Sequence, residues 1–158
     1  MIDTTELRFE ADVQAPITQV WQAWTTREGV ISFFAPDCRL GLTPGGAYEM
    51  YFNLDSAEGE RGGEGCRILA FEEPRMLSFT WNAPLEFSNA RRQKTHVTVR
   101  LEETKNGMTH VTLTHDGWGS GAEWQAVRVY FERAWEQVVL PRLQKRFTDG
   151  PIHWDELE

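Results

Sequence analysis

The chain has 158 residues, the usual size of one folded domain, which leaves little room for an enzyme built from two domains. Hydrophobic residues make up 41% and charged residues 25%, a composition typical of a soluble globular protein and not of a disordered or fibrous one. The formal net charge of -8 argues against binding to phosphate backbones or anionic lipids, so nucleic acid is not an expected partner. The unusual feature is the aromatic content of 12%, with seven Trp, because such rings either fill a core or line a binding site.

The two cysteines, Cys38 and Cys66, lie far apart in the sequence, and the first residues do not form a secretory signal. We therefore expect free thiols in a cytoplasmic protein. No apolar run approaches the roughly 18 residues that cross a bilayer, so membrane insertion is not expected.

The N-terminal third predicts one strand and two short helices. Residues 5–14 alternate between apolar and polar, which is typical of a half-buried strand. Pro16 suits the first position of a helix, and apolar residues recur at helical spacing from there to Thr25. Thr25 and Glu28 have the spacing of a capping box, which predicts a second short helix after Thr25.

The middle of the chain predicts strands separated by turns and loops. The turn signals are residues 43–46, residues 73–75 and Asn106-Gly107, the last being the strongest hairpin signal in the sequence. Residues 55–65 and 83–94 lack a clear period and are expected to be loops. The predicted strands are 38–42, 48–53, 67–72, 76–82, 95–103 and 108–115.

A long helix is predicted near the C-terminus. Ser120 and Glu123 have the spacing of a capping box, and an apolar stripe then continues to Phe147. Pro141 should bend this helix or end its regular hydrogen-bond ladder. The tail, residues 148–158, is either mobile or anchored by Trp154.

This order of elements favours an α+β fold. The long helix must lie across the curved antiparallel sheet of six to seven strands, because neither apolar surface can be buried otherwise. We expect one domain over residues 1–158, with its core between about residues 5 and 147.

Several spaced motifs together resemble a known family. They are residues 15–25, 42–46, 65–81 and 109–117, and the late Trp135 followed by Leu140 and Leu143. This pattern resembles the Activator of Hsp90 ATPase homologue 1-like group of the START-like (SRPBCC) superfamily. The resemblance implies the helix-grip, or Bet v 1-like, fold, whose members bind hydrophobic or amphipathic small molecules between the sheet and the C-terminal helix. Some relatives are cyclases, dehydratases or lipid carriers, so the fold alone does not give a reaction.

The sequence holds no recognisable catalytic or metal-binding motif. The cysteines and histidines form neither a CxxC nor an HExxH pattern, and Ser120 lacks the flanking glycines of a nucleophile elbow. We therefore expect no metal and no cofactor. His115 is a weak catalytic candidate: the strand period places it on the concave side, where it is either a general acid or base, an orienting group for a ligand, or a hydrogen-bonded core residue.

The aromatic residues predict a ring-lined space under the long helix. Their alternative role is that of plain core residues, and Trp21, Tyr51, Phe71 and Tyr130 fall on opposite phases, which would suit a homodimer interface. Trp118 is expected at the rim of the space. The residues expected to line the cavity are Trp24, Phe34, Tyr48, Met50, Phe52, Phe79, Trp81, His115, Trp118, Trp124, Val127 and Phe131.

Three functions follow from these patterns. The leading hypothesis is a protein that binds a small hydrophobic molecule. The first alternative is a cyclase-like or dehydratase-like enzyme that uses His115 with Tyr48 or with an inward-facing acid. The second is a protein-interaction module, linked to Hsp90 or to another partner.

Overall fold

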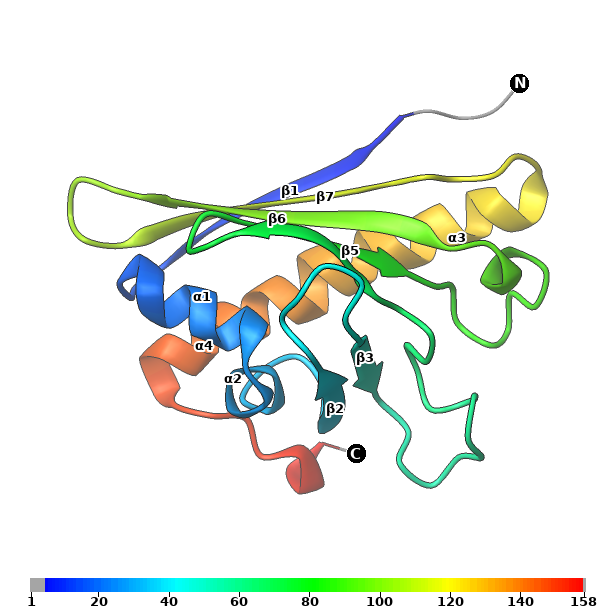
Figure 1. The fold of residues 1–158 in the computed structure, drawn as a ribbon, viewed down its shortest axis with the longest axis horizontal. Helices are drawn as coiled ribbons and strands as arrows, with labels where there is room; N and C mark the ends of the chain where they lie inside the picture. Colours follow the sequence, from blue (N-terminus) through cyan, green and yellow to red (C-terminus); the bar gives the residue numbers. More distant parts are fainter. Residues whose placement is uncertain (1–4, 158) are drawn as a thin grey trace.

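The computed structural model describes residues 5–157 as an α+β fold, in which one long helix crosses a curved antiparallel sheet (Figure 1). The N-terminal strand β1 is followed by two short helices, and the other strands precede the long helix. The strands are β1 Leu7–Val13, β2 Asp37–Leu40, β3 Tyr48–Tyr51, β4 Ile68–Glu72, β5 Met76–Trp81, β6 Thr95–Glu103 and β7 Thr109–Asp116. The helices are α1 Ile17–Thr25, α2 Arg27–Ile31, α3 Ala122–Arg133 and α4 Leu140–Asp149, with short 3-10 turns at Ala90–Arg92 and Trp154–Glu156.

The seven strands are divided between two sheets. Five form an antiparallel sheet in the order β1-β7-β6-β5-β4, and β2 and β3 form a separate hairpin. The hairpin is joined to the start of β4 by one bridge, between Ala47 and Arg67, and by neighbouring backbone hydrogen bonds from Tyr48 to Cys66 and from Ile68 to Gly46. The expected sheet of six to seven strands is therefore a five-stranded sheet with a two-stranded extension.

The strand alternation sets the inner face of the sheet. In β6 and β7 the odd-numbered residues from 95 to 101 and from 109 to 115 are buried, while their neighbours are at least partly exposed. Val97 pairs with His115 and Val99 with Leu113 across this face. The two helices α1 and α2 lie below the sheet beside the hairpin (Figure 1).

The link between α1 and α2 differs from the expected capping box by one residue. Thr25 is buried and donates its hydroxyl to the carbonyl of Trp21, at 2.8 Å. The N-cap of α2 is Thr26, whose Oγ1 accepts from the amide of Gly29 at 2.9 Å. The pattern T-T-R-E contains two threonines that could cap α2. Because Thr25 is the last residue of α1, Thr26 is the N-cap.

The long helix begins without the capping box that the sequence predicts. Its N-cap is Gly121, and no side chain caps it. The carboxylate of Glu123 instead accepts from the amide of Ala90 at 2.6 Å and from the side chain of Asn89 at 3.4 Å. This carboxylate therefore ties the loop before β6 to the first turn of α3.

The middle of the long helix is π-helical over Ala134–Val139, which ends two positions before Pro141. Pro141 has no N–H to donate, so the regular ladder cannot continue through it. The chain resumes as α4 and remains helical to Asp149, two residues beyond the predicted end. The residues that face the sheet are spaced by four and are all buried: Val127, Phe131, Trp135, Val139 and Leu143.

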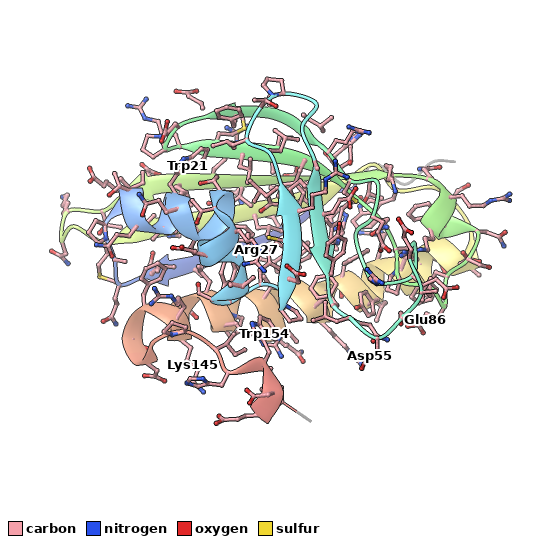
Figure 2. The ribbon with its side chains drawn as sticks, turned by 60° about the horizontal axis from the view of Figure 1, so that its bottom comes forward. Trp21, Arg27, Asp55, Glu86, Lys145 and Trp154 are labelled. Atoms are coloured by element: carbon pink, nitrogen blue, oxygen red, sulfur yellow. The ribbon has the colours of Figure 1, made fainter. Side chains whose placement is uncertain are left out.

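The C-terminal tail is anchored to the helices near the N-terminus. The amide of Ile152 donates to the carbonyl of Ser32, and the indole of Trp154 donates to the carbonyl of Ile31 at 2.6 Å. Arg142 lies over the Trp154 ring, 5.3 Å from its centroid, and Figure 2 labels Trp154 beside the C-terminal helix. Of the two expectations for the tail, the anchor at Trp154 is the one observed.

The helices of residues 5–157 include none with the length and apolar character of a membrane-spanning segment. Both cysteines are buried free thiols, as expected, and burial raises the pKa of each to about 11.

Gly29 in α2 packs directly against the backbone of α1. A β-carbon at this position would collide with the backbone of Gln22 and Ala23, which cannot move aside as a side chain would. We expect Gly29→Ala to lower the free energy of unfolding by about 2 kcal/mol or more, as overpacking does elsewhere. Urea denaturation measures this. Gly41→Ala is the control, because its β-carbon would meet only an ordinary contact at 3.9 Å, and an equal loss in both variants would contradict the steric explanation.

Candidate functional site

The space between the sheet and the middle of the long helix is filled with packed rings. Phe34 stacks on Trp81 at 5.6 Å between centroids, and Trp81 lies 5.9 Å from Trp135. Phe131 stacks on Trp135 at 6.3 Å. Such offset and edge contacts are favourable ring packing. These rings therefore form a continuous layer that joins the core to the surface beside the helix.

His115 is completely buried behind this layer. The indole Nε1 of Trp135 donates to its Nδ1 at 3.0 Å, and its Nε2 lies 2.7 Å from Oγ1 of Thr95. Because an indole N–H can only donate, Nδ1 must be an acceptor, and the ring proton is on Nε2 and is donated to Thr95. The ring also packs against Trp118 and Phe131, at 4.3 and 4.6 Å.

This setting keeps His115 neutral. Burial lowers the pKa of His115 well below its ordinary value of 6.5, and the charge of His96 acts in the same direction. Both ring nitrogens are occupied, and Tyr48 donates its hydroxyl to the carbonyl of Trp24 at 2.8 Å. Neither residue lines the pocket described below, so neither is placed to act on a molecule bound there.

A pocket of about 790 Å³ lies along the outer flank of the long helix. Its floor is the outer side of the ring layer, made by Phe34, Trp81, Phe131 and Trp135, which are themselves buried. The wall opposite the helix comes from Phe52 and Gly62 after β3, and from residues 82–84 and Arg91 after β5. Asp55 and Glu86, labelled in Figure 2, mark the two loops that supply this wall. The volume is within the range of small-molecule sites.

The helix contributes a second stripe to this pocket, beside its buried one. The members of this stripe recur three or four residues apart, so they share one flank of the helix. They are Ala126, Val129, Tyr130, Arg133, Ala134, Gln137 and Val138. Phe52, Val129, Tyr130 and Val138 are large apolar residues that remain 38 to 51% exposed. The pocket is thus an open groove with an apolar lining.

Arg91 and Asn82 hold the wall opposite the helix. The guanidinium of Arg91 donates to the carbonyls of Ala83, Gly59 and Gly62, at 2.6, 3.2 and 2.9 Å. The side-chain amide of Asn82 also donates to Gly62, at 3.1 Å. These bonds join the loop after β3 to the loop after β5, so the groove has a fixed outer wall.

Four of the twelve residues expected to line a cavity line this groove: Phe34, Phe52, Trp81 and Phe131. Seven others are buried in the core and do not reach it: Trp24, Tyr48, Met50, Phe79, His115, Trp118 and Val127. Trp118, expected at a rim, is buried and donates to the carbonyl of Thr5 at 3.1 Å. Trp124 is partly buried against Trp118, next to Gly119, where a side chain would collide with its indole.

The structure also differs from two predictions of which side chains face outward. Trp21, placed on an outward phase, is buried and packs 6.4 Å from Phe71. Tyr130, placed on the same kind of phase, is exposed but belongs to the groove. The groove residues that the sequence did not predict are the helix stripe from Ala126 to Val138, Val139 and Arg142 on the long helix, and Gly62, residues 82–84 and Arg91 in the opposite wall. The repeated three-and-four spacing of Val129, Tyr130, Arg133 and Gln137 was the available signal.

The sulfur, imidazole and carboxylate groups of residues 5–157 form no cluster of three or more that could hold a metal ion.

The buried neutral imidazole predicts a specific pH dependence. Below about pH 6.5 the unfolded chain takes up a proton at His115 that the folded protein cannot, so the folded state loses stability as the pH falls. The slope from this one group reaches about 1.4 kcal/mol per pH unit. We expect His115→Gln, which cannot be charged, to lose less stability between pH 7 and pH 5 than the wild type. Urea denaturation across this range measures it, and parallel curves would contradict the assignment.

Comparisons with known proteins agree with this fold. Residues 14–148 match the model of the family described as Activator of Hsp90 ATPase homolog 1-like protein. Protein MLL2253 from Mesorhizobium loti superposes with a TM-score of 0.72 at 20% identity, covering 94% of this chain and 100% of that one. Protein BH1534 from Bacillus halodurans gives 0.65 at 29% identity, covering 93% and 99%.

The Aha1 dimer from Colwellia psychrerythraea gives a TM-score of 0.68 at 18% identity, covering 92% of this chain and 98% of that one. The comparison with curated proteins yields no match. The likenesses below 25% identity concern the fold, and the family match extends over most of the chain. This chain therefore belongs to the family of Activator of Hsp90 ATPase homolog 1-like proteins, with their START-like fold.

Proposed function

We propose that this protein binds a small hydrophobic molecule in the groove beside its long helix. The observation that carries the proposal is the pocket of about 790 Å³ whose floor is four aromatic side chains. Binding would remove Phe52 and the apolar helix flank from water, which is the main source of affinity for apolar ligands, and would place the ligand against rings that are already buried.

The construction of the groove supports this proposal. Its floor is rigid, since Trp135 is held by its bond to His115 and by stacking against Phe131. Its outer wall is held by Arg91. A site that is formed before binding loses little conformational entropy when the ligand arrives. The resemblance to START-like proteins supports a hydrophobic ligand, but the ligands of those proteins lie between the sheet and the C-terminal helix, whereas this groove lies on the flank of that helix.

Phe52 provides a clean test, because its ring lies at the groove while 45% of it is exposed. We expect the neutral fluorescent probe N-phenyl-1-naphthylamine to bind the wild type, and Phe52→Ala to weaken binding about tenfold through loss of one ring contact. Probe fluorescence and quenching of the tryptophans measure this.

Leu69→Ala is the matched control for that test. Leu69 is 46% exposed on β4 and does not line the groove, so its truncation should leave probe affinity unchanged. A wild type that does not bind the probe, or a Phe52→Ala variant that binds it as well as the wild type does, would reject this site.

A second candidate is a protein-interaction module. Two exposed apolar residues, Leu54 and Leu85, lie outside the pocket but on the loops that border it, at 49 and 48% exposure. One related structure is described as an Aha1 dimer and another, from Plasmodium falciparum, as an HSP90 activator. A contact between two copies through these loops would cover both leucines.

If the protein forms such a dimer, Leu85→Glu should convert it to a monomer while Leu69→Glu should not, because a charge placed in an apolar contact is costly. Sedimentation velocity at several concentrations measures the mass. A wild type that sediments as a monomer throughout would remove this candidate and leave the ligand-binding proposal standing.

A further inference from the structure

The charged residues that line the groove are all of one sign. They are Arg91, Arg133 and Arg142, and the lining contains neither aspartate nor glutamate. The whole chain has 24 acidic residues against 16 Lys and Arg, for a net charge of -8. The charge of the groove lining is therefore opposite to the overall charge of the chain, and its three guanidinium groups favour an anionic ligand over a cationic one.

None of these three arginines is neutralised by a carboxylate within residues 5–157. The ion pairs of this part of the chain involve other residues. Arg91 donates to three backbone carbonyls, and Arg142 lies over the Trp154 ring. Arg133 is exposed at the end of α3 and makes no hydrogen bond or ion pair there. Arginine side chains usually bind carboxylate, sulfonate-like or phosphate groups through paired N–H donors.

The arginines and the rings lie along the same surface. Arg133 belongs to the helix stripe that holds Tyr130 and Gln137, one turn away on either side. Arg142 lines the groove further along, beyond Val138 and Val139. A bound molecule could therefore place its apolar part on the ring floor while an anionic group on it meets a guanidinium at the mouth.

We propose that the preferred ligand is a ring-containing small molecule with one anionic group, whose rings lie on the aromatic floor and whose charge is bound by Arg133, with Arg142 adding to the positive field. This inference rests on the proposed function and names the chemical class of its ligand. A neutral molecule of the same shape would keep the ring contacts and lose the charge-assisted bonds.

The environment of the other groups is consistent with this assignment. Burial lowers the pKa of Arg142, because its guanidinium has lost hydration that no carboxylate replaces. Burial, with a smaller contribution from Glu86, raises the pKa of Tyr130, and Glu86 lies outside the groove lining.

A matched pair of probes tests the proposal. N-phenyl-1-naphthylamine and 8-anilinonaphthalene-1-sulfonate share their rings, and the second adds one sulfonate. We expect the sulfonate to bind the wild type about tenfold more tightly, and added salt to reduce that preference. Arg133→Gln should remove most of the preference while leaving the affinity for the neutral probe within about twofold. Arg133→Lys should retain part of it, and Arg133→Gln combined with Arg142→Gln should remove the rest.

Arg100→Gln is the control for net charge, because Arg100 is exposed on the outer face of β6, away from the groove. It should keep the full preference. Equal affinities of the wild type for both probes, a preference that survives in the double variant, or an equal loss in Arg100→Gln would each overturn the anionic class and leave the neutral-ligand site intact. Failure of both probes to bind the wild type would overturn the groove itself. Thermal melting of each variant establishes that it is folded.

Discussion

The hydrogen bond from Trp135 to His115 connects the interior of this protein to its binding groove. One side of the indole belongs to the core, where its N–H satisfies a buried imidazole. The other side forms part of the groove floor, beside Phe34, Trp81 and Phe131. Because the imidazole is also bound to Thr95 on β6, the sheet fixes the orientation of the ring that a ligand would touch. His115, the catalytic candidate of the sequence analysis, therefore affects the groove indirectly, by orienting Trp135.

Much of the fold could be predicted from periodicity. The alternation in residues 95–103 and 109–115 identifies two central strands and their inner faces. A strand with one buried face needs apolar residues at every second position, so its sequence is strongly restricted. The groove was harder to predict, because both stripes of the long helix contain apolar residues. The sequence alone does not show which stripe packs against the sheet and which remains exposed. Phe52 continues the phase of Tyr48 and Met50, yet it lies just past the end of β3 and is exposed.

The helix caps were also difficult to predict from the sequence, for a physical reason. A carboxylate three residues after a serine can bond its own helix, but it can also bond any free amide that tertiary structure brings near. Glu123 bonds Ala90, which is 33 residues away in sequence. The spacing of residues in the sequence predicts only the bond within the helix and not the bond to a distant amide.

The widened turn in the long helix has a consequence for both of its stripes. Residues spaced by four drift steadily around a helix of 3.6 residues per turn, so a regular helix would turn Val139 and Leu143 away from the sheet that Val127 contacts. The π-helical segment holds more residues per turn and slows this rotation where Trp135 and Val139 lie. One irregular turn thus keeps two ends of the same helix aimed at one core, and it leaves the adjacent flank uncovered along its whole length.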